Sequence, residues 1–333
     1  MAFRYSDKYK KYSLDMHVNV TRDEFLKQFD PEALAKDIIS TGAEAGMMYI
    51  QSHYGYSYWP TKVGEMHPGL IGNEDAFKRL YDEMHKGGMD VDVYFSMIYN
   101  NWAYDHHPEW RIKDIDGNYS RDKGRRFGLC CPNSEGYKKF CRDQIADFTE
   151  YVGPYEAFFA DMTFWPTVCY CDNCRARWEK EVGGEMPRIV NWKDERWKLF
   201  QRKREEWLQD YMQYIYDSVK MVNPGAVVEM QNSTMPGSWM MGVTENATIA
   251  SDAVSGDLYG GFSQQTFACK LYYNMTPNLP FNYTTSRCEP SLDEHTTIKS
   301  EVMMKLHAML SFINHGSNIF VDAVDMTVGV QPP

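Results

Sequence analysis

Basic residues are scarce in this sequence. The 35 Lys and Arg residues stand against 46 Asp and Glu residues, which gives a formal net charge of −11. No basic stripe is available to neutralise a phosphate backbone, so nucleic acid is excluded as a partner. The sequence also lacks the G-x-G-x-x-G and P-loop motifs of nucleotide sites, and we expect no organic cofactor.

Long apolar runs are absent as well. No uninterrupted stretch reaches the roughly 20 residues that cross a bilayer. Residues 1–11 are polar and basic, and no apolar segment follows them as it does in a secretory signal. We therefore expect no membrane partner and a cytoplasmic location. In that compartment the eight cysteines are expected to be thiols or metal ligands rather than disulfides.

Aromatic residues are abundant, by contrast. They make up 15% of the 333 residues and include 9 Trp and 23 Tyr, whereas the 43% hydrophobic and 24% charged contents are those of a globular protein. Flat apolar rings with polar edges suit the faces of sugars, although they also fill protein cores.

Apolar runs of strand length alternate with helical segments along the whole chain. Because the strands are continuous apolar runs, the pattern predicts a parallel sheet covered by helices. Predicted strands cover residues 13–20, 46–50, 91–98, 155–159, 226–230, 253–258, 281–285 and 318–322, and predicted helices cover 31–39, 75–86, 134–151, 192–221 and 294–312. Eight strands favour a closed (β/α)8 TIM barrel, with a doubly wound open sheet as the alternative.

The chain ends just after the eighth predicted strand, at Pro333. We expect residues 1–333 to form one catalytic barrel domain. The absence of a further helix to cover that strand indicates either a fragment of a longer protein or another way of closing the barrel.

Functional residue types recur where the predicted strands end. The carboxyl ends of barrel strands all gather on one face, where active sites of such barrels lie. The residues expected on this face are His17, His53, Tyr99, Asp161, Glu229, Arg287 and Glu289.

Residues 53–62, His-Tyr-Gly-Tyr-Ser-Tyr-Trp-Pro-Thr-Lys, resemble the H-D-G-F-x-x-W-P-S-K segment of the family 29 glycoside hydrolases, the α-L-fucosidases. Residues 29–35, 94–96 and 158–161 are also similar to that family, and so is His17, at the position of a sugar-binding His. The sequence departs from the family at Ser52 and Tyr54, where the family has His and Asp. The uncharacterised relatives called hypothetical glycosyl hydrolase 6 are a further resemblance.

A cluster of thiols follows the fourth predicted strand, with Cys169, Cys171 and Cys174 in a C-x-C-x2-C spacing. Tetrahedral zinc takes four thiolates, so a remote cysteine is needed. We predict Cys131 as the fourth ligand, with Cys130 as the substitute, and three free buried thiols as the alternative to a metal site. Residues 131–134 and 169–174 resemble family 42 β-galactosidases, in which such cysteines hold a zinc ion. An all-thiolate site leaves no open position for water, so the zinc would be structural.

Glycoside hydrolysis with retention of configuration needs two carboxyl groups about 5–5.5 Å apart. Asp161 is the predicted nucleophile, because its place at a strand end agrees with the family resemblance; a helix cap is the alternative role. Glu289 is the preferred acid/base, since it lies in a loop that can lean over the opening. Glu229 and Asp257 are the other candidates.

Sugar hydroxyls are expected to receive hydrogen bonds from His17 and His53, and we expect at least one of Trp59, Trp102 and Trp165 to stack on the sugar. Further candidates for substrate binding are Tyr54, Tyr99, Asn232 and Arg287. The sequence therefore predicts a retaining exo-glycosidase, most similar to α-L-fucosidases, that acts on an oligosaccharide or glycoside. A homo-oligomer is possible. A β-galactosidase-like hydrolase with Glu289 as nucleophile, and a barrel that binds sugar without cleaving it, are the alternatives.

Overall fold

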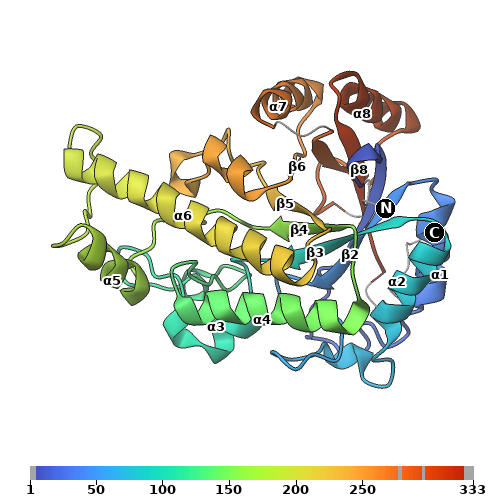
Figure 1. The fold of residues 1–333 in the computed structure, drawn as a ribbon, viewed down its shortest axis with the longest axis horizontal. Coiled ribbons are helices and arrows are strands. Elements are labelled where there is room, and N and C mark those ends of the chain that lie inside the picture. Colours follow the sequence, from blue (N-terminus) through green and yellow to red (C-terminus); the bar gives the residue numbers. More distant parts are fainter. Residues whose placement is uncertain (1–4, 277–279, 295–296, 326–333) are drawn as a thin grey trace.

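Eight parallel strands form a closed barrel in which each strand pairs with its neighbours in sequence order (Figure 1). The computed structural model describes residues 5–276, 280–294 and 297–325. The strands are β1 (Lys10–Asp15), β2 (Ala45–Gln51), β3 (Asp90–Ser96), β4 (Ala157–Asp161), β5 (Val227–Gln231), β6 (Ala253–Asp257), β7 (Asn282–Ser286) and β8 (Ser317–Ala323). Because β1 pairs in parallel with both β2 and β8, the sheet has no free edge. This confirms the predicted (β/α)8 barrel.

Helices surround the barrel, and Figure 1 shows α6 as the longest, extending well beyond the strands at one side. The helices are α1 (Pro31–Ser40), α2 (Ala76–Lys86), α3 (Asn101–His106), α4 (Glu135–Val152), α5 (Asp172–Glu181), α6 (Glu195–Val222), α7 (Phe262–Met275) and α8 (Glu301–Ile313). Short 3₁₀ turns cover Tyr5–Asp7, Pro68–Leu70, Pro108–Trp110, Arg121–Lys123, Trp239–Met241 and Glu245–Ala250. Within the described ranges, none of the helices is both long and apolar enough to cross a membrane.

Local sequence signals account for the ends of the main helices. Asp30 caps α1 by accepting a hydrogen bond from the Ala33 N–H at 2.9 Å, directly before Pro31 at the first helical position. Ser134 caps α4 in the same way. At the other end of α4, Gly153 has a φ of 95°, a positive value that residues other than glycine rarely adopt.

Three helices are missing from the sequence prediction, namely the six-residue α3, α5 and α7. The apolar residues of α7 do not follow a single helical stripe, since Phe267 and Tyr273 are exposed while Gln265 is buried. The helix α5 is short and highly charged. Neither segment therefore shows the apolar periodicity from which helices are predicted.

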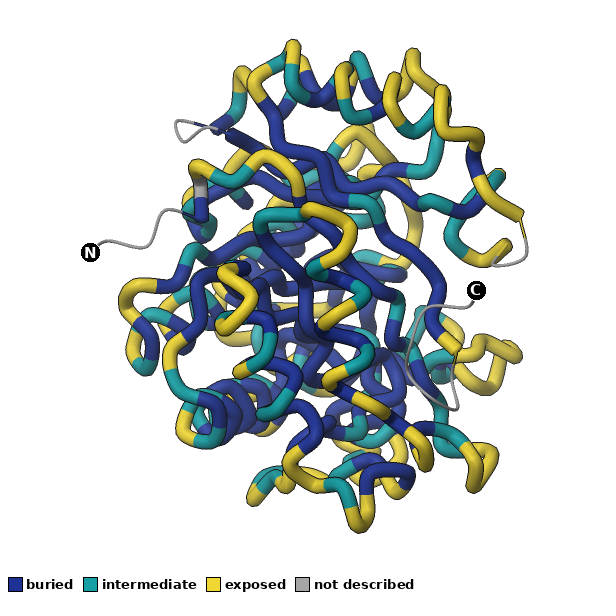
Figure 2. The backbone as a smooth tube through the Cα atoms, turned by 90° about the vertical axis from the view of Figure 1, so that its right-hand side faces the viewer, coloured by how far each residue is buried: buried dark blue, intermediate teal, exposed yellow. Residues whose placement is uncertain are grey.

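The first strand lies earlier in the chain than predicted, at Lys10–Asp15 instead of residues 13–20. Its register is fixed by β8, with Lys10 opposite Asn318 and Asp15 opposite Ala323. His17 therefore lies beyond the strand, where its side chain is free to turn toward the barrel axis. Figure 2 shows that buried residues dominate the interior of the molecule and that exposed residues lie on the outer turns.

Candidate active site at the carboxyl ends of the strands

A cavity of about 430 Å³ opens at the carboxyl ends of the barrel strands. Three of its carboxyl groups belong to the last residues of strands, namely Asp15 of β1, Asp161 of β4 and Asp257 of β6. The lining residues are Asp15, His17, Met47, Tyr49, His53, Tyr94, Arg126, Phe127, Phe159, Asp161, Met162, Asp257, Tyr259, Thr284, Ser291, Leu292, Asp293 and Val321. The structure thus brings His17, His53 and Asp161 of the predicted site together.

Asp161 is almost completely buried in the cavity, with 6% of its surface exposed. Its Oδ2 accepts a hydrogen bond from the Tyr94 hydroxyl and lies 4.0 Å from His53 Nε2. Burial and, next, the negative charge of Asp257 raise the pKa of Asp161 to about 7, against the opposing effects of the Tyr94 hydrogen bond and the charge of His17. A carboxyl group in a cavity whose pKa is raised this far above its usual value is a candidate catalytic residue.

A chain of hydrogen bonds connects Asp161 to a second carboxylate, Asp15. Tyr94 donates its hydroxyl proton to Asp161, so the Tyr94 oxygen accepts from His17 Nε2 at 3.2 Å. On the other side of the ring, His17 Nδ1 donates to Asp15 Oδ1. Burial alone would lower the pKa of His17, but the charge and hydrogen bond of Asp15 outweigh it and raise that pKa. His17 therefore carries both ring protons in this arrangement.

The protonation state of His53 differs from that of His17. The Ser96 hydroxyl donates to the Tyr99 carbonyl at 2.7 Å, so the Ser96 oxygen accepts from His53 Nδ1, which lies 2.7 Å away. Burial, together with the positive charges of His17 and Arg126, lowers the pKa of His53 well below its usual value. The ring is thus neutral, and its Nε2 faces the cavity as a hydrogen-bond acceptor. A sugar hydroxyl would donate to it, rather than accept from it as expected.

Asp257 is the carboxylate that the sequence ranked third and that the structure places in the cavity. Gln231 Nε2 donates to its Oδ1 at 2.6 Å, and the Tyr259 hydroxyl donates to its Oδ2 at 2.6 Å. A further donor, Ser233 Oγ, lies 3.4 Å from Oδ1. These donors hold the carboxylate in a fixed orientation two strands away from Asp161.

Glu229 does not reach the cavity. It is fully buried inside the barrel, where Asn282 donates to its Oε1 and the neighbouring Lys11 Nζ donates to Asn282 Oδ1 at 2.7 Å. Lys11 and Asn282 lie at the starts of β1 and β7, so this polar layer belongs to the opposite end of the barrel. Because its side chain points into this layer and is fully buried, Glu229 is sealed from substrate.

Glu289 lies next to the cavity without being one of its lining residues. It is half-buried in the loop after β7, and Ser291, Leu292 and Asp293 of the same loop do line the cavity. The main chain of this loop is held by the Glu289 N–H, which donates to the Thr297 carbonyl at 3.2 Å. Glu289 is therefore two residues from the rim.

The aromatic wall differs from the predicted one. Among the described residues that line the cavity there is no tryptophan, and Tyr49, Phe127, Phe159 and Tyr259 form the wall instead. The three candidate indoles each donate their N–H elsewhere: Trp59 to Asp147 at 2.8 Å, Trp102 to Glu65 at 3.0 Å and Trp165 to the Arg204 carbonyl at 2.8 Å. Trp59 and Trp165 are buried core residues, and the half-buried Trp102 packs against the core.

Four further candidates surround the cavity without lining it. The Tyr54 hydroxyl accepts from Arg126 Nε at 2.9 Å, and Tyr99 packs against His53 with 5.3 Å between ring centroids. Asn232 is fully buried and donates to the Met230 carbonyl at 2.8 Å. Arg287 donates to the buried Asp322 of β8. All four support neighbouring residues and do not face the space itself.

Arg126 and Phe127 line the cavity although no feature of the sequence pointed to them. Both come from the long polar loop between β3 and α4, far in sequence from any strand end. Asp15 and Tyr259 were also missed, although each lies within two residues of a noted residue, His17 or Asp257. That proximity was the one signal available for them.

The four cysteines of the predicted metal site lie together on one side of the barrel mouth. Cys131, Cys169, Cys171 and Cys174 are all buried, and their sulfur atoms lie within 4.8 Å of one another. The Cys131 sulfur is 3.5 Å from that of Cys174 and 4.0 Å from that of Cys169. A tetrahedral site with metal–sulfur bonds of about 2.3 Å has sulfur atoms about 3.8 Å apart. The cluster thus fits a metal ion. The substitute ligand Cys130 bonds instead to the Asn100 carbonyl, at 3.8 Å.

Neighbouring groups favour the thiolate of one cysteine in this cluster, Cys171. Hydrogen bonds from the Cys131, Cys169 and Cys174 thiols hold the pKa of Cys171 far below its usual value, whereas burial raises the pKa of Cys131 and of Cys174. Asn133 Nδ2 donates to the Cys174 sulfur at 3.3 Å. Thiolate ligands of metals are oriented by such surrounding donors.

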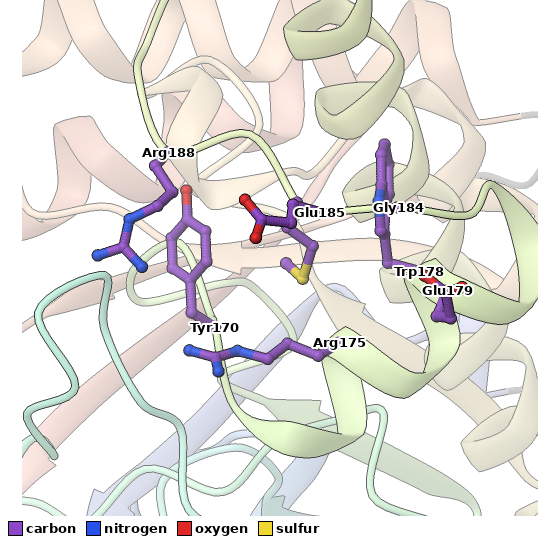
Figure 3. Close-up of a pocket in the computed structure, with 8 residues that line it drawn as sticks. Tyr170, Arg175, Trp178, Glu179, Gly184, Glu185 and Arg188 are labelled. Carbon is purple, nitrogen blue, oxygen red and sulfur yellow. The ribbon is translucent and has the colours of Figure 1, made fainter.

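A second cavity, of about 410 Å³, lies outside the barrel on the surface of α5 (Figure 3). It is lined by Tyr170, Arg175, Trp178, Glu179, Gly184, Glu185, Met186 and Arg188. Among the described residues that line it, none was predicted for the site, and none comes from a strand. Its place next to the cysteines, away from the strand ends, separates it from the candidate active site.

Comparisons with known proteins agree with the barrel fold. The sequence model of the family described as Alpha-L-fucosidase matches residues 3–254. Among solved structures, α-L-fucosidase isoenzyme 2 from Paenibacillus thiaminolyticus is similar with a TM-score of 0.79 and 16% identity, over 97% of this chain and 47% of the other. A β-galactosidase from Halorubrum lacusprofundi is similar with a TM-score of 0.67 and 13% identity, over 97% of this chain and 54% of the other.

A third similar structure is a family GH29 α-L-fucosidase from Bacteroides thetaiotaomicron, trapped as a covalent intermediate. Its TM-score is 0.58 at 13% identity, over 93% of this chain and 59% of the other. At such identities the likeness shows the barrel fold alone. The chain spans about half the length of the solved structures that it matches. No curated protein sequence matches it.

Proposed function

Because the chain belongs to the α-L-fucosidase family, we propose that it is a retaining exo-glycosidase that acts on an α-L-fucoside or a similarly shaped sugar. The observation that carries this proposal is the position of Asp161, a buried carboxyl group at the end of β4 that Tyr94 and the two histidines surround inside the cavity. A cavity of about 430 Å³ lies within the range of small-ligand pockets and suits a terminal sugar.

In this proposal Asp161 attacks the anomeric carbon, and the bond to the leaving oxygen breaks as a glycosyl-enzyme forms. The Tyr94 hydrogen bond and the protonated His17 favour the ionised form of Asp161 that the attack requires. His53 accepts a hydrogen bond from a sugar hydroxyl through Nε2, and the rings of Tyr49 and Tyr259 cover apolar faces of the sugar.

The second carboxyl group must give a proton to the leaving oxygen and then take one from water. Two residues are candidates. Glu289 is on the loop that forms part of the rim, and its proposed role requires this loop to lean inward. Asp257 already lines the cavity with Asp161, and its charge acts on Asp161 directly. Glu229 is set aside because it is sealed inside the barrel.

A panel of nitrophenyl glycosides assayed on the intact protein tests the proposed function. We expect the α-L-fucoside to be cleaved fastest, because the family resemblance and the match of residues 3–254 agree. Cleavage of a β-D-galactoside alone would favour the β-galactosidase-like alternative. Sugar binding without cleavage of any member of the panel would favour a non-catalytic barrel.

We also propose that the four-cysteine cluster holds a structural zinc ion. Thiolate ligands at these spacings favour zinc, and a closed set of four leaves no open position for catalysis. The zinc would tie the loop before α4 to the segment that leads into α5. Eight free, buried cysteines also agree with the cytoplasmic location that we propose.

Replacing Cys171 with Ser is expected to lower the zinc content from about one ion per chain and to reduce stability, because structural zinc contributes directly to folding. Elemental analysis and thermal unfolding measure the two effects. The matched control is Cys269→Ser, which removes another buried free thiol outside the cluster and should leave the zinc content unchanged. Wild-type protein prepared without chelators that contains no metal would contradict the zinc site.

A further inference from the structure

The two histidines in the cavity each place a ring nitrogen close to Asp161. One ring nitrogen of His17, one of His53 and a carboxylate oxygen of Asp161 all lie within 4.8 Å of one another. The rings themselves are close, with 4.0 Å between their centroids, and His53 Nε2 is 4.0 Å from Asp161 Oδ2. Once His17 has lost its Nε2 proton, three ligand atoms therefore lie close together in the cavity.

The opposite ring atom of each histidine is held by a fixed hydrogen-bond partner. His17 Nδ1 donates to Asp15, and His53 Nδ1 donates to Ser96, whose own proton is committed to the Tyr99 carbonyl. Histidines that bind metals almost always give their other ring N–H to such a partner, which fixes the ring and exposes Nε2. Asp161 is held in a comparable way by the Tyr94 hydroxyl.

We propose that His17, His53 and Asp161 form a binding site for a divalent transition-metal ion, which occupies the cavity in competition with the sugar. Metal–nitrogen bonds of about 2.1 Å place neighbouring ligand atoms about 3–3.5 Å apart, so small rotations of these side chains close the site. The ion takes the place of the Nε2 proton of His17, which passes to water, and the hydrogen bond between His17 and Tyr94 is lost. Water from the cavity fills its remaining positions, as in other sites of two histidines and one carboxylate.

The chemistry of the ligands selects the ion. Imidazole nitrogen suits nickel, cobalt, copper and zinc, whereas calcium and magnesium prefer oxygen ligands. Nickel is the suitable probe, because the thiolate cluster of Cys131, Cys169, Cys171 and Cys174 takes zinc by preference. Protein loaded with zinc thus has its cysteines occupied before nickel is added.

The proposal does not depend on the proposed glycosidase activity, because binding is measured directly. We expect calorimetric titration of zinc-loaded protein with nickel to show one site. His53→Ala should weaken nickel binding by at least about 10-fold, and Ser96→Ala should weaken it by about 10–100-fold through the loss of the group that orients His53. Circular dichroism and retained zinc show that each variant is folded.

The control is His106→Ala, since His106 is an exposed histidine outside the cavity. This variant should bind nickel at the cavity with unchanged affinity. A wild-type protein that binds no nickel at millimolar concentration would overturn the proposal. So would nickel affinity that is unchanged in His53→Ala or that is lost in His106→Ala.

Discussion

Replacing Asp161 with Asn is expected to lower the turnover of an aryl α-L-fucoside by about 10⁴-fold or more, because an amide cannot form the covalent bond to the sugar. The side chain keeps its shape, and its amide oxygen still accepts the Tyr94 hydrogen bond. Folding and sugar binding should therefore remain. Steady-state kinetics and calorimetric titration with fucose measure the two properties separately.

The matched control is Glu229→Gln, an equivalent change at a buried carboxyl group outside the cavity. It should alter stability, while turnover by the folded protein stays close to normal. Near-normal activity of Asp161→Asn on a substrate with a good leaving group would show that Asp161 is not the nucleophile.

Product configuration gives a second criterion for the role of Asp161. In Asp161→Gly, the space left by the side chain admits azide to the face from which Asp161 attacks. Azide should then give a glycosyl azide of inverted configuration, which NMR identifies. An azide product of retained configuration would indicate that Asp161 is the acid/base instead.

Removing the acid/base is expected to slow glycosides with poor leaving groups by about 10²–10⁴-fold, because their oxygen needs a proton from the enzyme. Substrates with activated leaving groups should lose much less in the first step. Azide should restore their turnover by attacking the glycosyl-enzyme, and the product should keep its configuration. Glu289→Ala and Asp257→Ala decide between the two candidates.

Only the true acid/base should show both the leaving-group dependence and the rescue by azide. The comparison is informative because the two residues differ in position: Asp257 lines the cavity, whereas Glu289 lies two residues from the rim. If neither variant shows both effects while each still binds sugar, the result would contradict the two-carboxylate mechanism.

The sequence by itself determined the barrel and part of the candidate site. Eight apolar strands alternating with helices favoured a closed barrel over a doubly wound open sheet, and the closed eight-stranded sheet agrees with that preference. His17, His53 and Asp161 were foreseen because residues at or just after strand ends gather on one face, whatever the details of packing. The four cysteines were foreseen because three of them are neighbours in the chain, and their grouping needed only one remote partner.

Only the tertiary structure decided which remaining residues face the cavity. Along a strand, side chains alternate between the barrel interior and the helices, and depth inside the barrel depends on register. Glu229 and Asp257 were equivalent in sequence, yet register buries the first in a polar layer near Lys11 and brings the second to the mouth.

Loop residues that face the cavity were even harder to predict from the sequence than strand residues. Arg126 and Phe127 reach the cavity from a long connection that has no periodic pattern, and their place depends on contacts with Tyr54 and His53. Trp59 and Trp165 were expected near sugar, but their N–H groups found buried acceptors elsewhere. Strand ends follow from the order of elements along the chain, whereas loop and side-chain positions follow from packing between residues far apart in sequence, which no local pattern records.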